Sequence, residues 1–179
     1  MRIIGGRYQR RLINPPAGLP VRPTTDKAKE ALFNILNNNF DFEAIRVLDL
    51  FSGTGNISFE FASRGAKEVV SIEKNHQCVR FMNKVKKDLE LSNLNVIKSD
   101  TFRFLNWCKE PFDIIFADPP YNLQQTKDLP AIVFDRKLLV DNGWLIIEHS
   151  SEFVFDDHAQ FLQKRKYSLA HFSFFGIKE

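Results

Sequence analysis

Short apolar runs and longer amphipathic segments alternate along most of this chain. The runs are rich in β-branched and aromatic residues, as in strands buried on both faces, and the longer segments repeat apolar residues at helical spacing. We expect strands at 47–51, 69–73, 95–98, 112–117, 144–148, 164–167 and 171–175. We expect helices at 26–36, 56–62, 74–89 and 129–138, and a turn at 141–143. This alternation predicts an α/β fold with a mostly parallel sheet, to which a terminal hairpin adds an antiparallel strand.

The first 23 residues have a different pattern. Two strand-like runs, 2–4 and 10–13, flank a glycine pair, and a turn-rich stretch follows. This pattern predicts a β-hairpin. Thr24-Thr25-Asp26 then has the form of a helix start. We therefore divide the chain into a hairpin extension, residues 1–23, and one domain, residues 24–179.

The strand expected at 112–117 ends abruptly in Asp118-Pro119-Pro120-Tyr121. Neither proline donates a hydrogen bond to a strand, and Pro119 disfavours helical geometry at Asp118. A carboxylate is thus fixed at the carboxyl end of a central strand, where open α/β sheets bind ligands, with an aromatic ring beside it. Taken alone, the motif is also compatible with a plain proline turn.

A glycine-containing loop follows the first strand of the domain. Gly53 and Gly55 allow a tight turn and a close approach of the backbone to a ligand. A dinucleotide site prefers a third glycine, but Ser58 stands at that position. Asp49, just before the turn, would repel a phosphate and suits a cationic or amino-bearing ligand.

Acidic residues also follow the next two strands. Glu73 lies 18 residues after Gly55, where a nucleoside ribose would offer its hydroxyls. Asp100 and Phe102 follow the strand at 95–98, where the acid could accept from an adenine amine and the ring could cover the base. Either acid could instead cap a helix, and for Asp100 alone the cap is the simpler interpretation.

The charge is distributed unevenly along the chain. The net charge of +3 separates into +5 for residues 1–25, where all five charged residues are arginines, and −2 for the remainder. Arginine grips phosphates bidentately and stacks on bases, and Tyr8 sits among these arginines. The segment therefore indicates a polyanionic partner, although a solvated segment without function is the alternative.

Other features narrow the class of protein. The two cysteines and four histidines have no metal-ligand spacing, so we expect no metal site, and two thiols suggest no disulfide framework. This cysteine usage is typical of a cytoplasmic protein. We find no signal peptide and no apolar run long enough to cross a bilayer.

Taken in order, these motifs resemble a known class of enzymes. Asp49-x-Phe51-x-Gly53-x-Gly55, Glu73, Asp100 and Asp118-Pro119-Pro120-Tyr121 resemble the S-adenosylmethionine-dependent methyltransferases that act on exocyclic amines. The opening Met1-Arg2-Ile3-Ile4-Gly5-Gly6-Arg7-Tyr8 and the segment Arg22-Pro23-Thr24-Thr25-Asp26 look like the bacterial RsmD family, which methylates guanine N2 in small-subunit (16S) ribosomal RNA. The resemblance covers essentially the whole chain and implies a Rossmann-like sheet of seven strands, one of them antiparallel. The chain departs from the family pattern at 153–161, where the helix that the family has before the last hairpin is hard to place.

The resemblance also implies roles for individual residues. Asp118, with the carbonyl of Pro119, would hold the acceptor amine, and Tyr121 would stack on the base. On the cofactor side, Glu73 would bind the ribose of S-adenosylmethionine. The remaining cofactor residues would be Asp49 at the methionine amino group, Phe51, Gly53 and Gly55 in the loop, Asp100 and Phe102 at the adenine, and Thr24 and Thr25 closing over the cofactor or capping a helix. The RNA contacts would be Arg2, Arg7, Arg10, Arg11 and Tyr121.

We expect a monomer that acts on 16S rRNA within a small-subunit particle. A DNA adenine-N6 methyltransferase is the alternative, since it would share the motif at 118–121, but it usually needs a target-recognition segment that no stretch here is long enough to supply. A nucleotide-binding dehydrogenase would be expected to have a third glycine in the loop after the first strand, where this chain has Ser58. A non-enzymatic RNA-binding module would leave the acids at successive strand ends unexplained.

Overall fold

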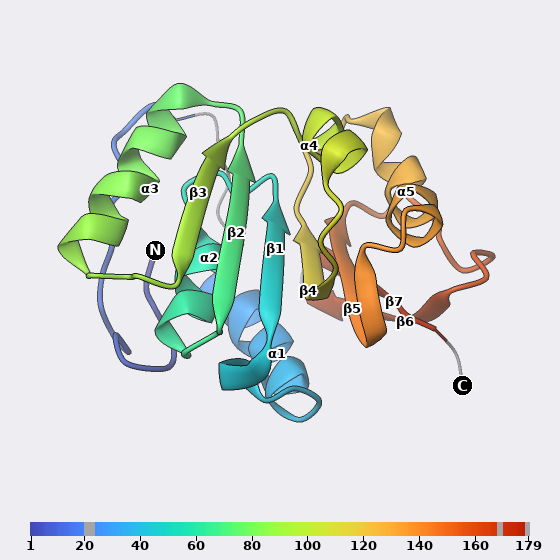
Figure 1. Ribbon diagram of the computed structural model, residues 1–179, viewed down its shortest axis with the longest axis horizontal. Helices are drawn as coiled ribbons and strands as arrows, with labels where there is room; N and C mark the ends of the chain where they lie inside the picture. The colour runs from blue at the N-terminus through green and yellow to red at the C-terminus, as the bar shows by residue number, and fades with distance from the viewer. Residues whose placement is uncertain (20–23, 168–169, 178–179) are drawn as a thin grey trace.

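Seven strands form a single sheet in the order β3-β2-β1-β4-β5-β7-β6 (Figure 1). The structure is a computed structural model that describes residues 1–19, 24–167 and 170–177. The strands are β1 (Arg46–Leu50), β2 (Glu68–Glu73), β3 (Leu94–Lys98), β4 (Phe112–Ala117), β5 (Leu139–His149), β6 (Phe161–Tyr167) and β7 (Ala170–Phe175). Neighbouring strands from β3 to β5 are parallel, and β7 is antiparallel to both β5 and β6. The expected mostly parallel α/β sheet with one antiparallel strand is confirmed.

Helices cover both faces of this sheet. They are α1 (Asp26–Asn37), α2 (Asn56–Ser63), α3 (His76–Asp88), α4 (Thr101–Trp107) and α5 (Leu129–Asp135), with short 3₁₀ turns η1 (Phe42–Ala44) and η2 (Gln124–Asp128). The first three helices share one apolar core, and α4 and α5 share a second core on the opposite face. Because successive strand residues point to opposite faces, Val47 packs in the first core and Leu48 in the second. This two-sided burial is why the strands appear as continuous apolar runs in the sequence.

The N-terminal segment, residues 1–13, is less regular than the expected hairpin. Its two runs pair antiparallel through one bridge, Arg2 with Leu12, and no strand is formed on either side. Hydrogen bonds of 2.9 Å join Ile3 N to Arg11 O and Ile13 N to Met1 O. Arg22 and Pro23, which contributed to the sequence resemblance, lie outside the described residues, as do Lys178 and Glu179.

The same segment packs closely against the domain. Figure 1 shows it passing α2 and α3, and Ile3 and Ile13 are buried in the first core. Gly6 has φ 77°, and a Cβ there would lie 2.0 Å from the carbonyl oxygen of Ser63 at the end of α2. A residue without a side chain is thus required for the segment to approach α2.

Two details of the second half differ from the sequence-based expectation. The turn expected at 141–143 lies inside β5, where Asn142 has φ 64° and the register with β4 shifts, so it is a bulge in one strand. Residues 150–160 contain turns and no helix. Phe155 from this stretch packs against His149 and Phe175, so aromatic side chains cover this part of the second core where a helix was expected.

Candidate active site

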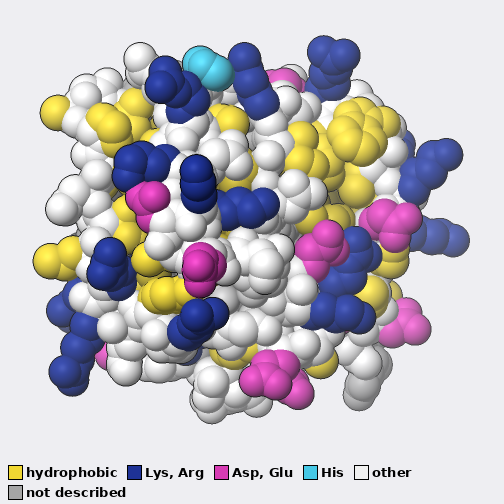
Figure 2. Space-filling view, turned by 60° about the vertical axis from the view of Figure 1, so that its left-hand side comes forward, with side chains coloured by type: hydrophobic (Ala, Val, Ile, Leu, Met, Phe, Trp, Pro, Cys, Tyr) yellow, Lys and Arg dark blue, Asp and Glu magenta, His cyan; other side chains and the backbone are white. Residues whose placement is uncertain are grey.

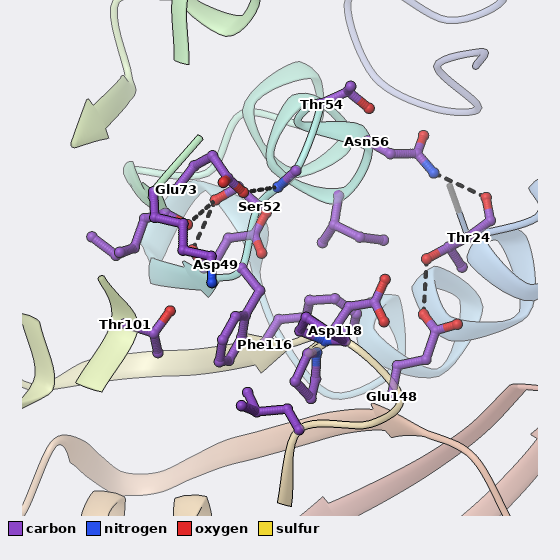
Figure 3. Close-up of a pocket in the computed structure, with 18 of the residues that line it drawn as sticks. Thr24, Asp49, Ser52, Thr54, Asn56, Glu73, Thr101, Phe116, Asp118 and Glu148 are labelled. Carbon is purple, nitrogen blue, oxygen red and sulfur yellow. Dashed lines mark hydrogen bonds between the residues drawn. The ribbon is translucent and has the colours of Figure 1, made fainter. Parts of the chain in front are cut away.

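A cavity of about 560 Å³ opens at the carboxyl ends of β1, β2, β4 and β5. Its size is that of a site for a small organic ligand. The parallel strands bring together residues that are far apart in the sequence, and Figure 3 shows several of their side chains around the cavity. The expected residues that line it are Thr24, Thr25, Asp49, Phe51, Gly53, Glu73, Asp100, Phe102, Asp118, Pro119 and Tyr121.

The loop between β1 and α2 has a strained backbone. Phe51, Gly53 and Gly55 all have positive φ, at 65°, 55° and 84°. Gly55 caps α2, and a Cβ there would lie 2.8 Å from the Phe59 ring and 2.9 Å from the Met82 side chain. Gly55 therefore packs against α2 and α3 and does not line the cavity, whereas loop residues 51–54 do. These left-handed conformations let the backbone turn tightly beside the cavity.

Glu73 holds this loop in place. Its Oε2 accepts from the backbone N–H of Gly53 at 2.8 Å, and its Oε1 accepts from Asn75 N at 2.6 Å. A carboxylate has about four acceptor positions, so these two bonds leave capacity for the hydroxyls of a ribose. The carboxylate is thus fixed in direction before any ligand arrives.

Asp49 lies deeper and is only 1% exposed. It accepts a hydrogen bond from the Ser58 hydroxyl, which is 2.6 Å from the hydroxyl of Ser71. Burial raises the pKa of Asp49 to about 7, although the bond from Ser58 opposes the shift. In the sequence Ser58 registered only as a missing glycine, whereas in the structure it is the hydroxyl partner of Asp49. A carboxylate in this setting favours a cationic ligand group, which would stabilise its charged form.

The apolar side of the cavity carries two aromatic rings. Phe51 and Phe102 lie with ring centroids 6.2 Å apart and an interplanar angle of 67°. Asp100 caps α4, since its side chain accepts from Arg103 N at 3.0 Å, and this confirms the capping interpretation. The cap leaves further acceptor positions on the carboxylate at the rim of the cavity.

The motif after β4 lies at the mouth of the cavity. Asp118 is half-buried, Pro119 is buried, and Tyr121 is 39% exposed. In Figure 3 the Asp118 carboxylate points into the cavity. The carboxylate and the exposed ring thus lie where a ligand that enters from solvent would meet them.

Glu148 and Asn56 also belong to this site, and the sequence analysis did not single them out for it. Glu148 in β5 is buried, and its Oε2 accepts from the Thr24 hydroxyl at 2.8 Å. The Asn56 side chain donates to the Thr24 carbonyl oxygen at 3.0 Å. Thr25 is the N-cap of α1. Glu148 could have been noticed as another acid near the end of a buried strand.

A buried ion pair connects this group to the N-terminal segment. Lys29 and Glu60 are 1% and 0% exposed and lie 3.3 Å apart. Lys29 Nζ donates to Asn56 Oδ1 at 2.9 Å and to Arg2 O at 2.6 Å. Glu60 accepts from the backbone N–H groups of Ile4 and Gly5. Burial lowers the pKa of Lys29, and the charge of Glu60 opposes that shift.

The arginines expected to contact RNA lie on the surface. Arg2, Arg7, Arg10 and Arg11 are all exposed. Arg2 pairs with Asp26 at 3.2 Å, and the Arg7 guanidinium lies over the ring of Tyr8. Figure 2 shows the side of the molecule that carries the N-terminal segment and α3, where Lys and Arg outnumber Asp and Glu. This face is suited to a polyanion.

The described part of the chain has neither a candidate metal site nor a candidate membrane-spanning helix. Within residues 1–19, 24–167 and 170–177, no group of three or more His, Cys, Asp and Glu side chains is placed to hold a metal ion. Across the same ranges, no helix is long and apolar enough to span a bilayer.

Comparison with known proteins gives consistent matches over nearly the whole chain. The chain is 34% identical over 151 residues to ribosomal RNA small subunit methyltransferase D of Escherichia coli (strain K12), covering 83% of this chain and 71% of that protein. A solved structure of a hypothetical protein from Thermus thermophilus matches with a TM-score of 0.87 at 25% identity, over 99% of each chain. An RNA methyltransferase from Salinibacter ruber, solved in complex with S-adenosyl-L-homocysteine, shares the fold with a TM-score of 0.68 at 15% identity, over 88% of this chain and 95% of that one.

The sheet order is that of the Rossmann-like methyltransferase fold, which the structural matches share. Among proteins with this fold, the model of the family described as Conserved hypothetical protein 95 matches residues 1–176. The chain belongs to this family.

Proposed function

We propose that this protein transfers a methyl group from S-adenosylmethionine to the exocyclic N2 amine of a guanine in small-subunit (16S) ribosomal RNA. The observation that carries the proposal is the position of Asp118 at the mouth of a cavity whose inner wall has the groups an adenosyl ligand needs. The 34% identity to the E. coli small-subunit enzyme supports the choice of RNA.

The residues of the inner cavity fit S-adenosylmethionine, which supplies an electrophilic methyl group on a sulfonium. Glu73 offers acceptor positions to the ribose hydroxyls while its backbone contacts hold it still. Phe51 and Phe102 provide an apolar wall for the adenine, with Asp100 at its rim. The buried carboxylate of Asp49 suits the methionine amino group.

The residues at the mouth hold the acceptor. The amine of guanine is a poor nucleophile because its lone pair is delocalised into the ring. Asp118 and the carbonyl of Pro119 accept hydrogen bonds from its two N–H groups and turn the lone pair toward the methyl group. As the nitrogen–carbon bond forms at the expense of the carbon–sulfur bond of the sulfonium, Asp118 takes the proton that the nitrogen releases. Positioning of this kind contributes roughly 7–11 kcal/mol to lowering a barrier. The carboxylate also stabilises the positive charge that develops on the nitrogen, and Tyr121 stacks on the base with about 1–3 kcal/mol.

The N-terminal segment binds the RNA in this proposal. Its exposed arginines neutralise phosphates and place the target base at the mouth. The protein acts as a monomer in the cytoplasm, on 16S rRNA within a small-subunit particle. Its extension spans residues 1–23 and its methyltransferase domain residues 24–179, with a boundary at residues that the structure does not describe.

Analysis of methylated nucleosides tests this function. Small-subunit RNA from a strain that lacks the gene should have lost N2-methylguanosine at one position. Purified wild-type protein with S-adenosylmethionine should restore it in particles from that strain, and the Asp118→Ala variant should not. Recovery of N6-methyladenine, or methylation of duplex DNA in preference to the particles, would favour the DNA adenine methyltransferase alternative.

A further inference from the structure

Glu148 and Asp118 occupy matching places on neighbouring strands. Ala117 of β4 and Ile147 of β5 are register partners in a parallel pair. Asp118 directly follows the end of β4, and Glu148 is the next residue of β5. Side chains alternate between the faces of a sheet, so both acids continue on the face of Phe116 and Ile146. Both line the same cavity, as Figure 3 shows.

The Glu148 carboxylate is held in one orientation by a series of buried contacts. Thr24 donates to its Oε2 at 2.8 Å, Asn56 donates to the Thr24 carbonyl at 3.0 Å, and Lys29 donates to Asn56 at 2.9 Å. Glu148 is 4% exposed, and Lys29 is anchored by Glu60. A buried carboxylate that is oriented in this way can accept a hydrogen bond from a ligand in the cavity that it lines.

The bases that carry an exocyclic amine differ in what lies beside it. In guanine the amine neighbours the N1–H group, which is a donor. In adenine the amine lies between the N1 and N7 lone pairs, and in cytosine it neighbours the N3 lone pair. Two adjacent carboxylates complement two adjacent donors, whereas a lone pair facing a carboxylate is repelled. Of these three bases, guanine alone presents the edge that fits both Asp118 and Glu148.

We infer that Glu148 determines the specificity of the site for guanine by accepting the N1–H of the target base while Asp118 holds its amine. This inference rests on the proposed function and deepens it. It gives the protein a means of rejecting adenine that needs no separate recognition segment. The contacts through Thr24, Asn56 and Lys29 connect the Glu148 carboxylate to the buried hydrogen bonds that hold the N-terminal segment.

The test replaces the methylated guanine, once it has been located by the nucleoside analysis, with 2-aminopurine in a ligated small-subunit RNA assembled into particles. This base keeps the amine but presents a lone pair at N1. Wild-type kcat/KM should fall by about ten- to a hundredfold relative to guanine, because a site built to bond an N–H discriminates against an analogue that lacks it. Glu148→Gln should bring the two rates within about threefold, since its amide can donate to N1.

Two further variants separate specificity from folding. Glu152→Gln makes the same chemical change at an exposed position four residues along, and it should keep the wild-type ratio. Glu148→Asp keeps the carboxylate and should keep the preference for guanine at a lower rate. Calorimetry with S-adenosylmethionine shows whether each variant is folded. If Glu148→Gln fails to bind the cofactor, the inference is tested by the wild-type rates on the two bases and by the base preference of Glu148→Asp.

Loss of the guanine carbonyl in 2-aminopurine affects the wild type and Glu148→Gln alike, so the change in ratio between them reports on residue 148. Equal wild-type rates on the two bases would overturn the inference, as would a Glu148→Gln ratio equal to that of the wild type. In both cases N2-methylguanosine would still form and the proposed function would stand. Absence of N2-methylguanosine from every wild-type reaction would overturn the proposed function itself.

Discussion

Asp118, Glu73 and Asp49 all lie at or near the ends of neighbouring strands, but their surroundings differ. Glu73 is bonded through both oxygens to backbone N–H groups, and Asp49 is buried against a serine hydroxyl. Asp118 is half-buried at the mouth of the cavity. In the proposed function the inner two bind the cofactor and the outer one binds the acceptor, and these differences lead to two predictions at the scale of single residues.

Asp118→Ala should lower the rate of methyl transfer by about a hundredfold or more, as expected for the loss of one positioned proton acceptor. Binding of S-adenosylmethionine should stay within a few-fold, because in the proposed mechanism this residue contacts the acceptor amine. A methylation assay on small-subunit particles and calorimetry with the cofactor measure the two effects. Asp135→Ala, at an exposed position at the end of α5, is the control. Loss of cofactor binding together with activity would contradict this placement of Asp118.

Asp49→Asn should change how stability depends on pH. The pKa of Asp49 is raised to about 7, against about 3.9 in an unfolded chain. Its protonation therefore favours the folded state below about pH 4, and this contribution is lost as the pH rises through 7. Relative to the wild type, the variant should gain of order 2 kcal/mol in unfolding free energy between pH 5 and pH 8. Urea denaturation at both pH values measures this gain.

The exposed Asp141→Asn substitution is the matched control for that experiment, since it removes a carboxylate that water already solvates. An equal stability difference for Asp49→Asn at pH 5 and pH 8 would show that the buried carboxylate does not titrate in this range.

At the scale of elements, the N-terminal segment has two sides. Its inner side supplies backbone N–H groups to Glu60 of α2 and a carbonyl to Lys29 of α1. Its outer side carries the exposed arginines. One segment thus takes part both in the buried network and in the proposed RNA surface, and separate substitutions should separate the two roles.

Replacing Arg10 and Arg11 together by Gln should weaken RNA binding and reduce its dependence on salt. Each phosphate contact adds about 0.7 to 0.9 to the slope of log affinity against log salt, so the slope should fall by about 1 to 2. Binding of small-subunit RNA at several salt concentrations measures this slope. Lys109 and Lys137, replaced together by Gln, remove the same charge from other exposed positions and serve as the control. Equal slopes for the two variants would argue against a specific role of the N-terminal segment.

Lys29→Met should lower the unfolding free energy by about 1–3 kcal/mol, because it leaves the oxygens of Arg2 and Asn56 without a donor, while Glu60 keeps its ion pair with Arg64 at 2.9 Å. Lys84→Met breaks a pair with Asp88 in which both side chains are exposed, and it should cost at most about 1 kcal/mol. Urea denaturation compares the two variants. Similar losses for both variants would mean that burial of the Lys29–Glu60 pair makes no difference to its contribution to stability.

At the scale of the whole molecule, the sheet order β3-β2-β1-β4-β5 collects the ends of strands that are separated by 20 to 100 residues in the sequence. The N-terminal segment then closes one face, with Ile3 and Ile13 in the core that α1, α2 and α3 share. The extension is therefore part of the packing of the domain.

Deletion of residues 1–13 should consequently destabilise the protein as well as remove RNA contacts. The loss of two buried isoleucines, about 1.5–3 kcal/mol each, corresponds to a fall of about 10 °C in Tm for a domain of this size. Thermal unfolding of the truncated protein measures this fall, and the Arg10 and Arg11 double variant should keep the Tm of the wild type. An unchanged Tm after truncation would show that the segment is a separable appendage.

The order of most elements, and the motifs at the strand ends, could be predicted from local patterns in the chain. Runs such as 112–117 are buried on both faces, so their apolar character identifies them without any partner. The motif at 118–121 combines two prolines with an acid and an aromatic residue, and the prolines alone predict that the strand ends there. Such patterns can be recognised because all their residues lie within a few positions of one another in the chain.

The contacts of Glu148, Ser58 and the pair Lys29–Glu60 could not be predicted in this way. Each of these depends on a partner that is 9 to 124 residues away. The burial of the N-terminal segment follows the same rule, because residues 1–13 have too few apolar side chains to fold alone and gain their order from α2. Local patterns are enough to predict helices and strands. The pairing of polar groups cannot be predicted from them, because the partners come within hydrogen-bonding distance only when the sheet has formed.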